Sequence, residues 1–360
     1  MKKSFDEVFV DNTKYCTKIK TSDYFEQGEY TIIDQGQNPI AGYTSLQDGV
    51  FNDVPAIIFG DHTRIIKYID EPFFIGADGV KVLKSKLPNS NYKYLYYALK
   101  NADIPNTGYN RHFKWLKEVK INYPSSEKQN EIVKILDEVV SIIDCRKQQV
   151  QKLDELVKAR FVELFGSMES KIPISEMCNV TGGYSFKSGD ISDDGAIKIL
   201  QIGNVYLDNV SWETTNYLPK GFDEKYSKFM LDEGDIVVAL TRPIIQSLGN
   251  VKACIVKSSD LPCLLNQRVG RIVVKKGKSV FLEFIYGCLM TDDFTRYVES
   301  CSIGCSQPNI STKDIENYLI PNATYEKQKA YVEFKKQTDK SKSVGAICID
   351  KIQSIKGGLL

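Results

Sequence analysis

The sequence predicts an α+β protein: two mixed α/β lobes separated by two long antiparallel helices that form a coiled-coil strut, with a pseudo-two-fold arrangement. Three observations predict this class. A long amphipathic stretch lies in the middle of the 360-residue chain, β-rich runs flank it, and the same order of elements occurs twice. The composition, 42% hydrophobic and 26% charged, is that of an ordinary globular protein.

The stretch from Ser125 to Phe165 carries apolar side chains at the heptad spacing of a coiled-coil seam. At 1.5 Å per residue, a helix of this length runs about 60 Å, which is too long for one small domain to cover. We therefore expect a partner helix along it. The seam residues assigned to helix pairing are Ile132, Leu136, Val139, Ile143, Val150, Leu153, Val157 and Leu164.

The predicted partner is a second amphipathic stretch, which follows Thr324 as its N-cap and ends near Lys356. Its seam is weaker and more polar in the middle, and its assigned pairing residues are Ile352 and Ile355.

Two arginines, Arg146 and Arg160, interrupt the seam of the first helix. One interpretation is that they extend along a broad helical face and reach solvent. The other is that they meet polar positions of the second helix, such as Thr338 or Ser341, and fix the antiparallel register.

Short β-rich runs between Gly, Asp and Asn turn signals predict a mainly β first lobe. An aromatic helix over 92–99 is interpreted as core, with a base-stacking surface as the alternative. A short apolar element over 113–121 follows, and Ser126 and Gln129 stand at capping-box spacing where the long helix begins. The expected strands are 30–33, 55–59, 65–69 and 79–83.

The same order of elements begins again after Gly166. One helix over 280–298, a Gly- and Ser-bearing loop over 302–311 and an apolar element over 314–320 are expected after the β-rich part. The expected strands are 197–202, 235–240, 252–256 and 269–274.

An offset of 199 residues relates the two copies. It pairs Gln129 with Gln328 and Leu116 with Ile315, so the agreement spans the last element of each lobe and the helix start. The predicted domains are a first lobe at 1–123, a central helix at 124–166, a second lobe at 167–322 and a C-terminal helix at 323–360.

Composition excludes several function classes. The nine cysteines show no framework spacing and are interpreted as free, mostly buried thiols, and with two histidines a zinc site is disfavoured. No apolar run approaches the roughly 20 residues of a membrane span, and the basic start Met1–Glu7 has no apolar segment behind it. We expect a cytoplasmic protein.

Two lobes held apart by a rigid strut suit a long ligand with two separated sites, and duplex DNA is the commonest such ligand. Candidate DNA contacts are polar side chains beside predicted turns, most of them forked or amide groups, and a lysine that could contact phosphate. For each of them, a structural role at a strand edge or a solvated hairpin is the open alternative. The candidates in the first lobe are His62, Arg64 and Lys81, and those in the second are Arg242, Gln246, Gln267 and Arg268.

A family resemblance adds to this interpretation. The loop from Gly304 to Ser311, followed by Asp314-Ile315, Ile320-Pro321 and Glu326-Lys327-Gln328 before a long helix, resembles the junction found in specificity subunits of Type I restriction-modification systems. The first copy, with Pro124 and Glu127-Lys128-Gln129, is similar in degraded form, and Thr181–Gly189 resembles the usual entry to a recognition domain. The loops at these junctions supply three more candidate DNA contacts, Arg111, Gln307 and Asn309.

The resemblance implies that each lobe reads one half of a bipartite target in double-stranded DNA and that the helices act as a ruler. It also implies two methyltransferase subunits as partners, which restriction subunits with motor and nuclease activity can join. The chain itself would bind no cofactor, whereas S-adenosylmethionine is expected in the partner methyltransferases, which methylate adenine. The resemblance further implies that this chain is a non-catalytic specificity subunit.

The residues agree with the absence of catalysis. The string Asn38-Pro39-Ile40 lacks the second proline and the aromatic of an amino-methyltransferase motif, and no Walker-type loop is found. Carboxylates such as Asp61 form no recognisable nuclease cluster in the sequence. The alternative function, from another class, is a coiled-coil scaffold protein with two protein-binding lobes.

Overall fold

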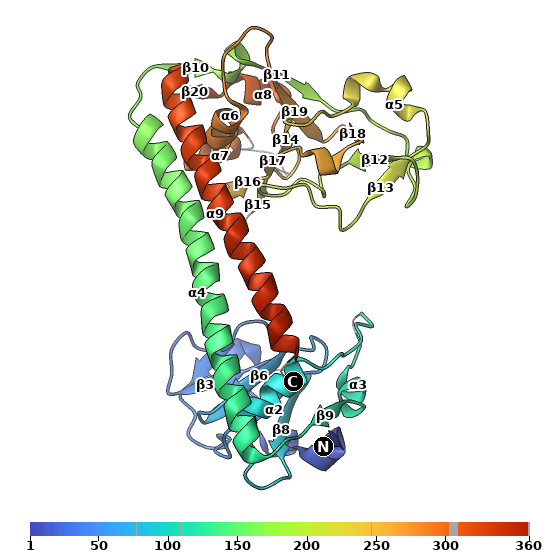
Figure 1. Cartoon of the computed structure of the whole chain (residues 1–360), viewed down its shortest axis with the longest axis vertical. Helices are drawn as coiled ribbons and strands as arrows, with labels where there is room; N and C mark the ends of the chain where they lie inside the picture. Colours follow the sequence, from blue (N-terminus) through green and yellow to red (C-terminus); the bar gives the residue numbers. More distant parts are fainter. Residues whose placement is uncertain (77, 109, 246, 302–308, 359–360) are drawn as a thin grey trace. The chain divides into compact units, whose positions relative to one another are not determined.

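The structure is a computed structural model of the chain and describes residues 1–76, 78–108, 110–245, 247–301 and 309–358. The described chain forms two compact units, one made of residues 1–148 and 345–360 and the other of residues 149–344. The long helices α4 (Ser126–Phe165) and α9 (Tyr325–Gly358) each contribute to both units (Figure 1).

The first unit is built on three small sheets. A four-stranded antiparallel sheet has the order β2-β8-β5-β6, a three-stranded sheet has the order β4-β3-β7, and β1 pairs with β9. Its strands are β1 (Lys2–Ser4), β2 (Phe9–Asp11), β3 (Tyr30–Ile33), β4 (Gly42–Thr44), β5 (Ala56–Gly60), β6 (Ile66–Ile69), β7 (Phe73–Ile75), β8 (Val80–Ser85) and β9 (Lys120–Asn122). Its short helices are α1 (Phe5–Val8), α2 (Tyr92–Lys100) and α3 (Phe113–Lys117).

The second unit repeats this topology. Its four-stranded sheet has the order β11-β19-β14-β17, its three-stranded sheet the order β13-β12-β18, and β10 pairs with β20. The strands are β10 (Lys171–Pro173), β11 (Cys178–Gly182), β12 (Ile197–Leu200), β13 (Asn216–Leu218), β14 (Ile236–Ala239), β15 (Ile244–Ile245), β16 (Asn250–Val251), β17 (Ala253–Ile255), β18 (Cys263–Leu265), β19 (Val269–Val274) and β20 (Leu319–Pro321). The short helices are α5 (Phe222–Lys225), α6 (Leu282–Leu289), α7 (Asp292–Cys301) and α8 (Thr312–Asn317).

The offset of 199 residues reappears in the element bounds. It relates α3 to α8, β9 to β20 and the first residue of α4 to that of α9. In both three-stranded sheets the central strand pairs antiparallel with one neighbour and parallel with the other. The α+β class with two β-rich lobes and two long helices, predicted from the sequence, is confirmed.

A buried glutamine explains the repeated Glu-Lys-Gln signal. The Gln129 side chain donates to the Pro124 carbonyl (3.0 Å) and accepts from the backbone N–H of Asn91 (3.1 Å). Gln328 makes the same two contacts, with Ala323 and Phe281, at 2.9 and 3.1 Å. Each glutamine therefore joins the start of a long helix to the start of a helix in its lobe, so the capping box expected between Ser126 and Gln129 is wrong.

Within the second unit, α4 and α9 pack side by side and run antiparallel (Figure 1). Phe161 and Phe165 of α4 contact the Tyr331 ring, with centroids 5.2 and 5.9 Å apart. Farther along, the Lys342 ammonium is 2.7 Å from the Asp154 carboxylate. Because the residue numbers fall on one helix as they rise on the other, the pairing is antiparallel.

The predicted pairing residues lie in different surroundings. Ile132 and Leu136 are buried in the core of the first lobe, with Ile57, Phe59 and Leu95. Val157 and Leu164 pack against the core of the second lobe, which includes Tyr331. Ile143 is buried, the half-buried pairing residues are Val139, Val150, Leu153 and Ile352, and the side chain of Ile355 lies outside the described part.

The seam arginine Arg160 takes neither of the two expected roles in full. Its guanidinium pairs with Glu163 one turn on, at 2.7 Å, and lies over the Phe334 ring of α9 at 5.9 Å. The hydroxyls of Thr338 and Ser341 instead donate to carbonyls four residues earlier on their own helix. Arg146 is exposed.

Three sequence expectations need correction. The helix expected over 280–298 is two helices, α6 and α7. The Thr291 hydroxyl accepts a hydrogen bond from the Phe294 N–H and so caps the start of the second helix. The N-terminal strands β1 and β2 are absent from the prediction. Of the eight cysteines in the described residues, four are buried, three are half-buried and Cys145 is exposed, so the expectation that they are mostly buried is too strong.

Candidate nucleic-acid interface

In the first unit, the turn between β5 and β6 carries two predicted DNA contacts, His62 and Arg64. The Arg64 N–H donates to the Gly60 carbonyl (2.7 Å), and the Gly60 N–H donates to the Ile65 carbonyl (2.8 Å). Arg64 closes this turn with a φ of 62°. A side chain in the left-handed region costs on the order of 1–3 kcal/mol, which points to a use for the guanidinium that glycine would not serve.

Asp61 joins this turn to two other loops. Its N–H donates to the Gly79 carbonyl (2.7 Å), and its own carbonyl accepts from the His112 N–H (2.7 Å). Its carboxylate accepts from the Phe113 N–H at 2.7 Å. Asp61 is 4% exposed, so this carboxylate is a structural acceptor rather than part of a nuclease site.

Gln35, which follows β3, brings a fourth loop to the same place. Its side chain accepts from the His62 N–H and donates to the Asp78 carbonyl, both at 3.1 Å. A Cβ at Gly79, where φ is 92°, would lie 2.9 Å from the Gln35 amide and from the His62 ring. Glycine is therefore required at position 79 for this close approach.

The remaining first-lobe candidates differ in their surroundings. Arg111 is exposed and lies near Asp78, whose pKa is lowered mainly by a hydrogen bond from Lys18, with a smaller contribution from Arg111. Lys81 is engaged within the lobe, since its ammonium is 3.1 Å from the Asp11 carboxylate and 4.9 Å from the centre of the Phe113 ring. Arg111 thus joins the loop cluster around Asp61, whereas Lys81 holds β8 to its neighbours.

In the second unit, Gln267 and Arg268 form the turn between β18 and β19, and both are exposed. The backbone of this turn is held on both sides. The Gln267 N–H donates to the Tyr184 carbonyl, and the Arg268 carbonyl accepts from the Leu240 N–H, each at 2.9 Å. The two side chains extend from a rigid turn, as base or phosphate contacts require.

Arg242 and Asn309 lie on neighbouring segments of the second unit, because Thr241 and Asn309 form an antiparallel bridge. The Ile310 N–H donates to the Leu240 carbonyl at 2.9 Å. Arg242 is exposed and, like Arg64, has a positive φ, 47°. The structure therefore brings Arg242, Arg268 and Asn309 into one loop cluster.

The two loop clusters are built alike. Leu240 occupies the place of Asp61, since they follow β14 and β5, which hold the same inner position in the two four-stranded sheets. Each donates its N–H to the turn before the neighbouring strand, at Arg268 or Gly79, and each accepts from the segment before the next helix. A strained arginine follows each of them by two or three residues.

An aromatic cluster beside Gln267 was not among the sequence candidates. The Tyr184 ring lies 4.5 Å from the Tyr226 ring and 5.3 Å from the Phe229 ring, and Tyr184 is 37% exposed. The hydrogen bond to Tyr226 raises the pKa of Tyr184. Its neighbour Gly183 passes so close to the Asn266 carbonyl that a Cβ there would lie 2.3 Å away.

Sequence reasoning had no signal for Gln35 or for the linking role of Asp61. For Tyr184 the signal existed, because it lies in the Thr181–Gly189 motif that carried the resemblance. Two other candidates, Gln246 and Gln307, lie outside the described residues.

The described part of the chain offers no group of three or more His, Cys, Asp or Glu side chains that could hold a metal ion. A search of the same residues for a helix long and apolar enough to cross a membrane also found none.

Comparison with known proteins gives the family. The model of the Type I restriction modification DNA specificity domain matches residues 2–155 and 168–344. The chain is 33% identical over 271 residues to the Type I restriction enzyme MjaVIII specificity subunit of Methanocaldococcus jannaschii, an alignment covering 68% of this chain and 63% of that protein. It is 32% identical over 150 residues to the EcoAI specificity subunit of Escherichia coli, covering 41% of this chain and 24% of that protein. The chain thus spans less than two thirds of the length of these relatives.

Solved structures share the fold. The S subunit of a Type I restriction-modification system from M. genitalium matches all of this chain and 94% of its own, with a TM-score of 0.54 and 16% identity. A chain from a structural study of complex assembly and conformational transition in the type I R-M system matches with a TM-score of 0.55 and 12% identity, covering 100% of this chain and 96% of that chain. Because the family model covers nearly all of the sequence, the chain belongs to the Type I restriction modification DNA specificity family.

Proposed function

We propose that this chain reads a two-part target in double-stranded DNA, one part with each loop cluster, and directs adenine methylation by partner subunits. The observation that carries the proposal is the repeated loop cluster. In both units, exposed or half-exposed forked side chains lie at the end of the corresponding inner strand of the four-stranded sheet, β5 in the first unit and β14 in the second.

The chemistry of the side chains suits base edges. Arginine can donate two hydrogen bonds to guanine, and glutamine or asparagine can pair with adenine in the major groove. Arg268, Gln267 and Asn309 combine these types on a backbone held by hydrogen bonds to its neighbours. In the first unit, Arg64 and Arg111 would serve the same purpose, with His62 beside them. Lys81, Gln246 and Gln307 remain candidates for phosphate or base contacts.

We propose two methyltransferase subunits as partners, with S-adenosylmethionine bound in them, and restriction subunits as further components. An apolar stripe on α4 supports docking of other chains. Ile135 and Ile142, which lie seven residues apart in the first unit, are 44% and 48% exposed. Such a stripe on a long helix is typical of a surface that another helix covers.

The test of base reading is Arg268→Ala, with Lys276→Ala as the matched control. Both residues are exposed and flank β19, one before it and one after it. Loss of a bidentate guanine contact should cost about 1–3 kcal/mol of discrimination at one base pair. Long-read methylome sequencing of the host should show the motif relaxed at that position for Arg268→Ala and unchanged for Lys276→Ala.

Two outcomes would oppose the proposal. Adenine methylation that persists unchanged after deletion of the gene would exclude a role in choosing the target. Binding to duplex DNA that does not weaken between 50 and 200 mM salt would favour a protein-binding scaffold, because several phosphate contacts make binding steeply salt-dependent, on the order of 10³-fold or more.

The helices would set the spacing between the two half-sites. Inserting one heptad between Arg146 and Val150 lengthens α4 by about 10 Å, at 1.5 Å per residue. Since DNA rises about 3.4 Å per base pair, the spacer should grow by about three base pairs. A methylated motif with an unchanged spacer would contradict the ruler role.

A further inference from the structure

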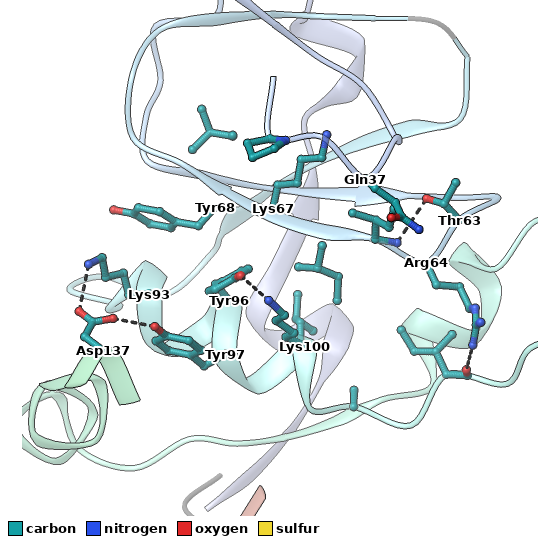
Figure 2. A pocket seen from close by; sticks show the side chains of 17 residues that line it. Gln37, Thr63, Arg64, Lys67, Tyr68, Lys93, Tyr96, Tyr97, Lys100 and Asp137 are labelled. Atoms are coloured by element: carbon teal, nitrogen blue, oxygen red, sulfur yellow. Dashed lines mark hydrogen bonds and ion pairs between the residues drawn. The ribbon is translucent and has the colours of Figure 1, made fainter. Parts of the chain in front are cut away.

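A groove follows the edge of strand β6 in the first unit. It is a cavity of about 750 Å³ lined by every residue from Thr63 to Ile69, so it runs along the backbone of the strand (Figure 2). Helix α2 forms the opposite wall with Tyr96 and Lys100, and Asp137 of α4 lies at one end. We call this cavity the β6 groove.

β6 is the last strand of its sheet and pairs with β5 among the described residues. An edge strand presents backbone N–H and C=O groups that can pair with another chain, and proteins normally cover or blunt such edges. A groove between an edge strand and a helix is a geometry in which an extended peptide can add as a further strand.

The second unit covers the corresponding edge with its own chain. There the last strand is β17, and the connection between β12 and β13, residues 201–215, reaches it. Val205 and Val210 of this connection are buried against Cys254 of β17. In the first unit the corresponding connection, residues 34–41, is shorter. It reaches β6 where the Asn38 carbonyl accepts from Lys67 at 2.6 Å, and Gln37 and Pro39 line the groove that remains beside the strand.

A carboxylate holds the covering segment in place. The Tyr286 hydroxyl of α6 donates to the Asp208 carboxylate at 2.7 Å, and it is 3.3 Å from the Ala253 carbonyl of β17. Gln129 and Gln328 contact Asn91 and Phe281 in the same way, and the offset between these two partners matches Tyr286 with Tyr96 of the first unit.

At Tyr96 the first unit has a cation instead of a carboxylate. The Lys100 ammonium donates to the Tyr96 hydroxyl at 2.9 Å and lies 5.2 Å from the centre of its ring. Arg64, also on the groove, donates to the neutral Ile104 carbonyl. These two cations are thus bonded to neutral oxygens.

The groove as a whole is basic. Among its described lining residues the cations are Arg64, Lys67, Lys93 and Lys100, whereas Asp137 is the single carboxylate. Asp137 is already engaged, because it accepts from Lys93 (3.0 Å) and from the Tyr97 hydroxyl (2.7 Å). Lys67 is engaged as well, because its ammonium is 3.4 Å from the Asp34 carboxylate and donates to the Asn38 carbonyl at 2.6 Å. Arg64 and Lys100 are therefore the lining cations that an acidic ligand would complement.

We propose that the β6 groove receives an extended acidic segment of a partner protein, which pairs with β6 as an added strand and places carboxylates on Lys100 and Arg64. The segment would do for the first unit what residues 201–215 do for the second. Arg64 is shared with the proposed DNA contacts, whereas Lys100 belongs to the β6 groove alone, so a charge reversal at Lys100 tests this proposal separately from DNA reading.

The probe is a fluorescein-labelled peptide of four Glu-Val repeats, titrated with the full chain and followed by fluorescence anisotropy. We expect saturable binding that weakens at least tenfold in one of two methylated forms, which carry the methyl groups on either the valine or the glutamate nitrogens. The reason is that the N–H groups of alternate residues face opposite edges of a strand, and only one edge can pair with β6. A peptide of four Lys-Val repeats should not bind. Failure of the acidic peptide to bind, or equal binding of all four peptides, would overturn the proposal.

Two charge-reversal variants test whether the peptide binds in the β6 groove. Lys100 and Lys117 are both exposed, each ends a short helix, and each lies over an aromatic ring four residues earlier, at 5.2 and 5.3 Å. Lys100→Glu should weaken the acidic peptide at least tenfold, and Lys117→Glu should leave it within twofold. Equal effects would refute the site. Displacement of the peptide by ATP, with the same dependence on Lys100, would assign the groove to a small anion instead.

Discussion

Replacing Arg64 by alanine and by glycine separates the contribution of its guanidinium from the free-energy cost of its left-handed backbone conformation. Both variants lose the guanidinium and its 3.0 Å hydrogen bond to the Ile104 carbonyl, which is worth about 1 kcal/mol. Only the alanine variant keeps a Cβ in the left-handed region, at a cost of about 1–2 kcal/mol. The glycine variant in turn loses about 0.5–1 kcal/mol of stability, because glycine gives up more conformational freedom on folding than alanine does.

The glycine variant should therefore be more stable than the alanine variant by about 0.5–1 kcal/mol. For a unit of this size that difference corresponds to about 2 °C in the melting temperature. Calorimetry of the two variants measures it directly. The same comparison at Arg242, whose φ is 47°, tests whether the second unit has the equivalent strain.

The two variants should lose the same affinity for DNA, although their stabilities differ. Both substitutions at Arg64 remove the fork that would contact a base, so both should lose about 1–3 kcal/mol of affinity for the methylated motif, measured by titration of labelled duplex. Recovery of binding in the glycine variant would refute the assignment, because backbone relief alone would then account for the effect. Equal melting temperatures of the two variants would refute the strain.

Three further predictions concern the helices. Gln129→Ala should destabilise the first unit by about 2–4 kcal/mol, because it leaves two backbone groups without their partner, whereas Gln148→Ala on the exposed face of α4 should change hydrogen-exchange protection little. A double-mutant cycle of Asp154→Asn and Lys342→Met should give a coupling of about 0.2–1 kcal/mol, since Asp154 is 49% exposed and screened by solvent. Partial burial opposes ionisation of Asp339, yet hydrogen bonds from lysines, among them Lys342, lower its pKa, so its contribution is present at neutral pH and is lost as acid protonates it. Urea unfolding between pH 7 and pH 3 should show this loss in the wild-type chain and less of it in Lys342→Met.

Much of the fold follows from patterns that are local in the chain. Heptad spacing of Leu136, Ile143 and Val150 predicts the long helix, because the period of a helix is set within a few residues. Strands β3 and β19 coincide with their predicted ranges for the same reason. The break between α6 and α7 was missed, since it depends on a single hydroxyl, that of Thr291.

The sequence by itself determined the family, the two copies at an offset of 199 residues, and the residue types at the candidate DNA contacts. Only the tertiary structure decided which of them come together. The union of Arg242, Arg268 and Asn309 rests on backbone hydrogen bonds of Leu240 to segments far away in the chain, and no local period encodes such pairing. The groove beside β6 is likewise a property of the folded unit, because it is formed by β6, α2 and part of the connection 34–41, which lie apart in the sequence.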